Sequence, residues 1–255
     1  MNDTNDFYDA LAPFYHLIHG DWEEGMTRQG EGLDAVLREE LGEGARTVLD
    51  VAAGIGTQSL ALAARGYEVT ASDLSPRAVE RLREEAARRG VAVRAEVADM
   101  TRAWEAHGRE FDAVVCCDNA LPHLLADDQI RDALRGFLRC TRPGGACLVS
   151  TRDYGVVDLE AARFHPHGAR VHDGARWILF QLWEPRPPLY DTSMYIVEDR
   201  GTGEPRTRVM RTTYYAVPVE RVMELMREAG FEGVRRLDGV FFQPLLVGRR
   251  PDGAA

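Results

Sequence analysis

Short apolar segments alternate with helix-like segments between residues 46 and 154, and this alternation constrains the fold more than any other feature of the chain. Near-continuous apolar strands are typical of a parallel sheet that is covered on both faces. The sequence therefore predicts an α/β fold with a mostly parallel, Rossmann-like sheet. The strands expected in this core are 46–53, 67–73, 91–100, 111–119 and 146–154, and the helices between them are 57–66, 76–90 and 127–140.

The segments that flank this core follow other patterns. Helices are expected at 7–19 and 22–41, a loop around HPHGARVHD, and three antiparallel strands between 177 and 217. A helix at 218–230 and a terminal strand pair would complete a seven-strand sheet with a C-terminal antiparallel hairpin. We expect one domain over 1–255, made of a helical lid (1–43), a cofactor-binding core (44–153), a β insertion over the acceptor site (154–217), and the last helix and hairpin (218–250).

Polar or glycine-rich residues stand at the ends of the five expected core strands. Ligands of open α/β sheets bind beyond the carboxyl ends of the strands, so these residues should meet at one edge. They are the stretch 50–56, Asp73, Asp99, Asn119 and Arg152.

The loop LDVAAGIG (49–56) lies between the first strand and the next helix, where glycines let a backbone approach a ligand closely. A dinucleotide would require G-x-G-x-x-G, but the third glycine position is Ser59. The frame Ala52-x-Gly54-x-Gly56 behind Asp50 instead matches the first motif of S-adenosylmethionine-dependent methyltransferases, with alanine in place of one glycine. Asp73 could accept the ribose hydroxyls, which suits either cofactor.

Further stretches narrow the resemblance, because together they are similar to the glycine/sarcosine N-methyltransferases. They are residues 8–34, the glycine loop with the following SDLSPRAVE, CCDNALPHLL, STRDY, RTTYYAV and FFQPLLVGRR. The resemblance implies a class I methyltransferase fold over essentially the whole chain, with S-adenosylmethionine as cofactor and a small carboxylate-bearing amine as acceptor.

The same resemblance implies roles for individual residues. Arg28 would contact the methionine carboxylate of the cofactor, and Tyr8 would stand near the sulfonium. Asn119 would orient the acceptor amine, and Arg152 would clamp its carboxylate, as a planar guanidinium is suited to do. The expected catalytic residues are Asn119, Tyr8 and Arg152; the cofactor residues are Arg28, Asp50, Ala52, Gly54, Gly56, Asp73, Leu74, Asp99 and Met100; the acceptor residues are Tyr15, Asn119, His123, Arg152, Tyr190 and Tyr214.

Several of these residues also have a structural interpretation. Arg152 could be a surface arginine paired with Asp153, and Asn119 could be a turn amide that caps the next segment. Asp118 fits a backbone turn or a cofactor contact, and His123 fits a hydrogen-bonded structural histidine better than an acid or base.

Methyl transfer is an in-line displacement, so most of its acceleration can come from orienting the acceptor, and a strong general base is not required. No metal is expected, because HPHGARVHD lacks cysteine and the chemistry needs none. All 31 basic residues are arginine, which excludes a Schiff-base or Walker A lysine. The four cysteines show no C-x-x-C spacing and are interpreted as buried thiols.

The formal net charge of −10 disfavours a nucleic-acid partner. No apolar run approaches the length of a membrane span and no signal peptide is recognised, so we expect a cytoplasmic protein, with a homodimer left open. The alternatives to glycine or sarcosine are another small acceptor (N, O, S or C) in specialised metabolism and a non-catalytic cofactor-binding sensor. A nicotinamide oxidoreductase and a nucleic-acid or protein methyltransferase are disfavoured.

Overall fold

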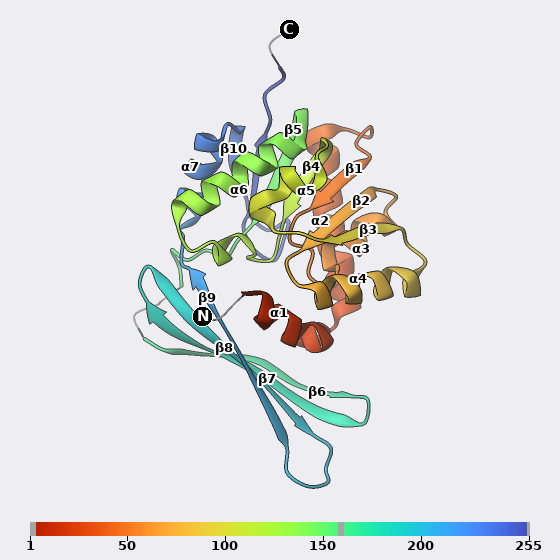
Figure 1. The fold of residues 1–255 in the computed structure, drawn as a ribbon, viewed down its shortest axis with the longest axis vertical. Helices are drawn as coiled ribbons and strands as arrows, with labels where there is room; N and C mark the ends of the chain where they lie inside the picture. Colours follow the sequence, from red (N-terminus) through yellow and green to blue (C-terminus); the bar gives the residue numbers. More distant parts are fainter. Residues whose placement is uncertain (1–3, 158–160, 254–255) are drawn as a thin grey trace.

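A computed structural model describes residues 4–157 and 161–253, and its centre is a seven-stranded sheet in the order β10-β11-β5-β4-β1-β2-β3 (Figure 1). Strands β1 to β5 are parallel to one another, while β11 is antiparallel to both β5 and β10. The mostly parallel sheet with a C-terminal antiparallel hairpin is therefore present as expected. The strands are Thr47–Asp50 (β1), Glu68–Asp73 (β2), Val93–Val97 (β3), Phe111–Cys116 (β4), Thr141–Ser150 (β5), Glu232–Leu237 (β10) and Leu245–Arg249 (β11).

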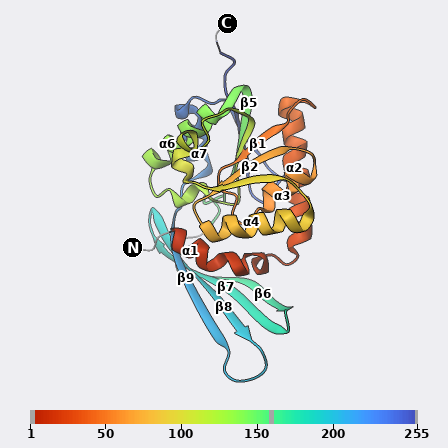
Figure 2. The ribbon, with the colours of Figure 1, turned by 45° about the vertical axis from the view of Figure 1, so that its right-hand side comes forward.

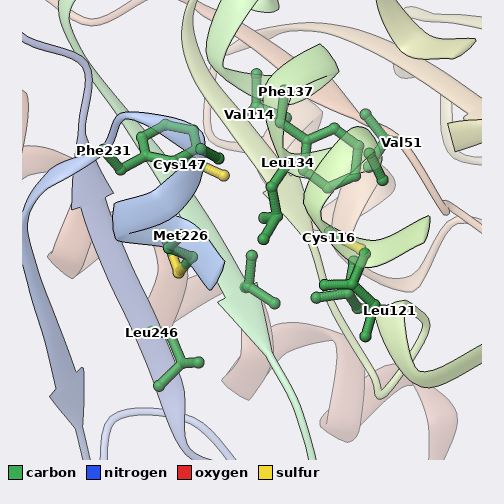
Figure 3. Packing of buried hydrophobic residues seen from close by; sticks show 14 of the residues in the cluster. Val51, Val114, Cys116, Leu121, Leu134, Phe137, Cys147, Met226, Phe231 and Leu246 are labelled. Atoms are coloured by element: carbon green, nitrogen blue, oxygen red, sulfur yellow. The ribbon is translucent and has the colours of Figure 1, made fainter. Parts of the chain in front are cut away.

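Helices cover both faces of this sheet. One apolar cluster joins α5 (Ala103–His107), α6 (Asp127–Cys140) and α7 (Val219–Ala229) to the sheet, and Figure 3 shows part of it. A second cluster joins the opposite face to α2 (Trp22–Leu41), α3 (Thr57–Ala64) and α4 (Pro76–Arg89). Leu134 and Phe137 of α6 are fully buried, and truncating such a side chain to alanine typically costs about 2–5 kcal/mol.

Capping residues set the ends of α4 as its sequence indicates. The Ser75 hydroxyl accepts a hydrogen bond from the Ala78 N–H at 3.0 Å, and Pro76 occupies the first turn. Gly90 ends the helix with a left-handed φ of 65°.

The insertion forms a separate antiparallel sheet of four strands, in the order β6-β7-β8-β9. Three strands were expected, and the additional strand is β6, which contains most of the HPHGARVHD stretch that was expected to be a loop. This expectation was wrong because β6 pairs along β7 although it lacks the apolar alternation of a strand. The four strands are Arg163–His172 (β6), Ala175–Arg186 (β7), Leu189–Asp199 (β8) and Arg206–Tyr215 (β9).

Two further boundaries differ from expectation. The helix expected at 7–19 is divided into α1 (Thr4–Leu11) and a 3-10 helix, η1 (Ala12–Ile18), because Pro13 lacks the N–H that would continue the α-helix. Residues 143–145, whose Pro-Gly-Gly sequence is typical of a turn, lie inside β5.

Helices α1 and η1 lie between the two sheets (Figures 1 and 2). Phe7, Leu11 and Leu17 are buried against the inner face of the four-stranded sheet, where they contact a cluster that includes Trp177 and Met194. This position between the core and the insertion is where a lid would have to lie. The four-part division of the chain stays a prediction, and residues 1–3 of the proposed lid and 158–160 of the insertion lie outside the described residues.

The described residues bear on the expectations about membrane spans, metal ligands and cysteines. No helix in them is long and apolar enough to cross a membrane. No group of three or more potential metal ligands is found in the same residues. All four cysteines are free and buried, and burial raises the pKa of the Cys116 and Cys117 thiols well above the usual value.

Candidate active site

Asp50, at the end of β1, supports the glycine loop through its carboxylate. One carboxylate oxygen accepts the Ser59 hydroxyl at 2.6 Å, and the other lies 3.4 Å from the Ala52 nitrogen. Burial raises the pKa of Asp50 to about 7. Asp50 therefore supports the loop and is not among the residues that line the neighbouring cavity. Gly56 does not line that cavity either; a Cβ at this position would lie 2.9 Å from the Leu82 side chain.

Asp73 at the end of β2 connects that strand to the glycine loop. Its carboxylate accepts the Gly54 N–H at 2.8 Å and the Ser75 N–H at 2.9 Å. Burial raises the pKa of this carboxyl. The acid thus lies at the edge of the loop, where the sequence placed a ribose-binding group.

A cavity of about 660 Å³, here called the cofactor cavity, opens above the loop. This volume is within the range of about 300–1,000 Å³ that small-molecule sites occupy. Nine of the sequence-predicted residues line it: Tyr8, Tyr15, Ala52, Gly54, Asp73, Leu74, Asp99, Met100 and His123.

Arg28 does not line the cofactor cavity. Its side chain is 71% exposed, with Glu24 at 3.9 Å. The next residue, Gln29, is buried and accepts from Gln58 at 2.6 Å, so Arg28 projects about 100° around the helix from the buried face. A contact between Arg28 and the cofactor stays a prediction. Gln58 and Thr57, at the start of α3, line the cavity instead, and a helix N-terminus after a glycine loop is the signal that could have identified them.

A second, smaller cavity of about 100 Å³ adjoins the first and is here called the inner cavity. Tyr8, Tyr15 and Asp118 line both cavities, so they form the boundary between them. The other residues of the inner cavity are Phe7, Leu11, Ile18, Asn119, Arg152, His167, Gln181, Trp183 and Tyr214.

Asp118 and Asn119 follow β4 with left-handed φ values of 56° and 62°. The Asp118 N–H donates to the Ser150 hydroxyl at 2.8 Å, and the Asp118 carboxylate accepts the Tyr15 hydroxyl at 3.3 Å. Burial raises the pKa of Asp118 to about 6. Sequence reasoning left Asp118 as a turn residue or a cofactor contact and did not place it on the boundary between the two cavities.

The Asn119 side chain lines the inner cavity but is already engaged by the protein. Its oxygen accepts the Arg152 N–H at 3.0 Å and the Thr151 hydroxyl at 3.2 Å, while its amide nitrogen donates to the Tyr154 hydroxyl at 2.9 Å. Asn119 thus fixes the segment that carries Arg152. A direct contact with an acceptor amine stays a prediction.

Arg152 is half-buried and lines both the inner cavity and an outer cavity of about 380 Å³. Its guanidinium lies 4.3 Å over the Trp183 ring and donates to the Tyr190 hydroxyl at 3.1 Å. The alternative interpretation, a surface pair with Asp153, is wrong, because Asp153 pairs with Arg236 at 2.8 Å. Within residues 4–157 and 161–253, no carboxylate lies within 4.0 Å of the Arg152 guanidinium.

At the boundary between the cofactor cavity and the inner cavity, three aromatic side chains are in contact: Tyr8, His123 and Tyr214. The Tyr8 hydroxyl lies 2.7 Å from His123 Nε2, and the His123 ring centroid is 4.1 Å from that of Tyr214. Burial lowers the pKa of His123 to about 3, so its imidazole is neutral and shares a hydrogen bond with the Tyr8 hydroxyl. Tyr190 is fully buried and lines neither cavity; its hydroxyl reaches Arg152 and, at 2.8 Å, the Tyr154 hydroxyl.

Comparison with known proteins agrees with this geometry. Residues 48–145 match a family model described as a methyltransferase domain. The glycine/sarcosine N-methyltransferase of Parasynechococcus marenigrum (strain WH8102) is 34% identical over 159 residues, which are 60% of this chain and 51% of that protein. The chain thus spans about half the length of this curated relative.

Solved structures resemble the chain over most of its length. The sugar N-methyltransferase KedS8 from Streptoalloteichus sp ATCC 53650 has a TM-score of 0.74 at 21% identity, covering 90% of each chain. SAM-bound CalS10, an amino pentose methyltransferase from Micromonospora echinaspora, has a TM-score of 0.76 at 19% identity, covering 94% of this chain and 96% of the other. At such identities the likeness shows the fold, and it confirms the predicted architecture of sheet and insertion.

Proposed function

We propose that this chain, which carries a methyltransferase domain at residues 48–145, transfers a methyl group from S-adenosylmethionine to a small amine that carries a carboxylate, such as glycine or sarcosine. The predictions of the methyltransferase family and of S-adenosylmethionine as its cofactor are confirmed by the domain match and the methyltransferase neighbours. The identity of the acceptor is the part that we propose.

The observation that carries the proposal is the guanidinium of Arg152 in the wall of the inner cavity. The guanidinium is half-buried, and its direct partners are the hydroxyls of Tyr190 and Tyr154 and the Trp183 ring. Asp118 acts on it electrostatically without forming an ion pair. A guanidinium presents five N–H donors in a planar fork, and Tyr190 uses one of them. An acceptor carboxylate would supply a directly bonded counter-ion through two parallel hydrogen bonds.

The residues of the cofactor cavity are suited to S-adenosylmethionine. An acid at the end of β2 fits the ribose hydroxyls, and Asp99 with Met100 fits the adenine. When bound, the cofactor supplies an electrophilic methyl group. We assign its binding to Ala52, Gly54, Asp73, Asp99 and Met100.

The size of the inner cavity supports a small acceptor. Its volume of about 100 Å³ is roughly that of three water molecules. An acceptor held there by Arg152 would present its other end toward Tyr8, Tyr15 and Asp118, which border the cofactor cavity. Such alignment can supply roughly 7–11 kcal/mol of the barrier reduction in well-oriented cases.

The test is steady-state kinetics with glycine and sarcosine for Arg152→Lys and Arg152→Met. We expect the KM for both acceptors to rise at least tenfold in each variant, because lysine cannot reproduce the bidentate fork. Arg176→Met is the control, since Arg176 lies on β7 outside the three cavities and pairs with Asp199 at the surface. Unchanged KM values in both Arg152 variants would contradict the proposal.

The outer cavity favours a second candidate, an amino sugar. It lies beyond Arg152, shares Arg152, His167, Gln181 and Trp183 with the inner cavity, and offers about 380 Å³ for a larger acceptor. An amino sugar lacks a carboxylate, so its KM should be insensitive to Arg152→Met. The Arg152 variants therefore separate the two candidates.

A further inference from the structure

We propose that the Asp118 carboxylate binds the acceptor nitrogen at the boundary between the two cavities, which makes the protein selective for amines. The inference rests on the proposed methyl transfer to a small acceptor and adds the residue that recognises the reacting atom. It does not depend on Arg152, because an amino acid and an amino sugar both carry the amine.

Asp118 lies where the two cavities meet. It shares the boundary of the cofactor cavity and the inner cavity with Tyr8 and Tyr15, and it is the only carboxylate among the described residues that lines both. A methyl group passing from one cavity to the other has to cross this boundary. The side chains here are therefore those nearest to the transfer.

The backbone fixes Asp118 in this position. The peptide nitrogens of Asp118 and Asn119 donate to the hydroxyl and the carbonyl oxygen of Ser150, at 2.8 and 3.2 Å. Both bonds tie the turn to the end of β5. A side chain anchored in this way is pre-organised and needs little reorganisation when an acceptor binds.

The carboxylate has free accepting capacity. An ionised carboxyl has about four lone-pair sites; among the described residues the Tyr15 hydroxyl donates to Asp118 at 3.3 Å, and Arg152 acts on the carboxylate electrostatically without forming an ion pair. No arginine or histidine nitrogen of those residues lies within 4.0 Å of the carboxylate. An amine N–H at the boundary could therefore donate a hydrogen bond to a carboxylate oxygen of Asp118 that the protein leaves largely unused.

The charge of Asp118 suits the chemistry of the nitrogen. As the nitrogen lone pair forms the new N–C bond, the electron pair of the broken C–S bond stays on sulfur, and a positive charge moves onto nitrogen. A fixed carboxylate beside that nitrogen stabilises the developing charge, and fixed charges act most strongly in sites that exclude water. The product ammonium then returns its proton to solvent after release.

The two ends of the inner cavity are of opposite charge. Asp118 is shared with the cofactor cavity and Arg152 with the outer cavity, so the acid lies on the cofactor side and the guanidinium on the far side. A short zwitterion with its nitrogen toward the cofactor matches this order. Acetate, which has a carboxylate and no amine, should use only the Arg152 side.

The experiment is calorimetric titration of glycine, sarcosine and acetate into the full-length protein with S-adenosylhomocysteine present, together with acceptor kinetics. We expect Asp118→Asn to weaken glycine and sarcosine binding at least tenfold, since hydrogen bonds to charged groups contribute roughly 1.5–3 kcal/mol. Acetate affinity should stay within twofold or rise. Turnover should fall by at least tenfold for the amines.

Two further variants keep the result interpretable. Asp118→Gly removes the carboxylate at a φ of 56°, where glycine is favoured, so it tests the same point if the asparagine variant fails to fold. Asp128→Asn, an exposed carboxylate on α6 outside the cavities, is the matched control.

The outcomes separate this inference from the proposed function. If the wild type methylates an amine and both Asp118 variants keep their amine affinity and turnover, the inference is wrong while the function stands. If amino sugars are methylated, glycine is not, and the Asp118 variants lose turnover, the inference stands and the carboxylate-bearing acceptor is wrong. If the wild type binds no amine with S-adenosylhomocysteine present, both are wrong.

Discussion

The Tyr8 hydroxyl lies 2.7 Å from Nε2 of His123, which joins the N-terminal helix α1 to the turn after β4 across 115 residues of sequence. The His123 ring also contacts Tyr214 of β9. Helix α1, the core and the insertion are therefore connected at a single point on the boundary of the two cavities. If the N-terminal helices move during the reaction, this contact has to break and re-form.

We expect Tyr8→Phe to reduce turnover by at least tenfold while lowering the free energy of unfolding by only about 1–3 kcal/mol, the cost of removing the hydroxyl that hydrogen-bonds to half-buried His123. Amide exchange of residues 4–18 should become faster. Tyr195→Phe, on the outward side of β8 and away from the cavities, should change neither quantity. Equal exchange rates and full turnover in Tyr8→Phe would argue against a functional contact.

Two glycines test whether the loop binds the cofactor. Gly54 has a φ of 54° and Gly66 a φ of 91°, and a Cβ at either would meet nothing within 4 Å. Alanine at each should therefore cost about 1–2 kcal/mol of stability from the left-handed backbone alone. Only Gly54→Ala should weaken S-adenosylhomocysteine binding, measured by calorimetry, because only Gly54 lines the cofactor cavity. Equal affinities in the two variants would place the cofactor elsewhere.

The pKa of Asp118, raised to about 6 by burial, predicts a pH dependence of kcat/KM at saturating cofactor. Transfer requires the neutral amine, which titrates at about 8 to 10, so the logarithm of kcat/KM should rise with a slope of one above pH 6. Below pH 6 Asp118 is also protonated, and the slope should become two. In Asp118→Asn the slope should stay at one throughout, and a slope of two in that variant would assign the second proton to another group.

The groups that face Asp118 do not titrate in this range. Burial raises the pKa of Tyr8, Tyr15 and Cys117 well above the usual values, so all three are neutral. Arg152 stays charged. Asp73, which shares the cofactor cavity, is controlled by keeping the cofactor saturating.

Asp112 provides a prediction about stability. Its carboxylate accepts the backbone N–H groups of Arg46 and Thr47 at 2.9 Å and pairs with Arg142 at 2.6 Å. Although burial acts in the opposite direction, these partners lower the pKa of Asp112 to about 2. Since the folded pKa is below the unfolded value of about 3.9, the carboxylate contributes stability above pH 4, and this is lost as the pH falls toward 2.

Asp112→Asn should therefore reduce the free energy of unfolding by about 1–3 kcal/mol at pH 7, and the deficit should shrink as the pH approaches 2. Denaturant unfolding across this range measures it. Asp238→Asn, which disrupts an exposed pair with Arg236, should cost well under 1 kcal/mol. A deficit in Asp112→Asn that does not depend on pH would contradict the assigned cause.

The core could be predicted from the sequence because its signals are local. The apolar runs, the Ser75-Pro76 cap and the glycine loop each act within a few residues, and parallel strands bring their carboxyl ends together without further information. Strand β6 could not be predicted in this way. Its polar sequence forms a strand because β7 offers a partner, which is a tertiary effect.

The placement of individual side chains at the site depends on tertiary structure in a similar way. Arg28 was placed in the site by resemblance, but the buried Gln29 decides which side of α2 faces the protein. Asp118 was undervalued because its left-handed backbone and the proximity of Tyr15 depend on segments far apart in the sequence. Residue spacing in the sequence predicts neither the orientation of Arg28 nor the surroundings of Asp118.

The measurement that tests the central claim most directly is formation of S-adenosylhomocysteine by the wild-type protein with glycine, sarcosine, dimethylglycine and an amino sugar offered separately. The account predicts turnover with glycine or sarcosine and a much lower kcat/KM for the amino sugar, which cannot engage Arg152 through a carboxylate. Turnover with the amino sugar and none with the three carboxylate-bearing amines would contradict it.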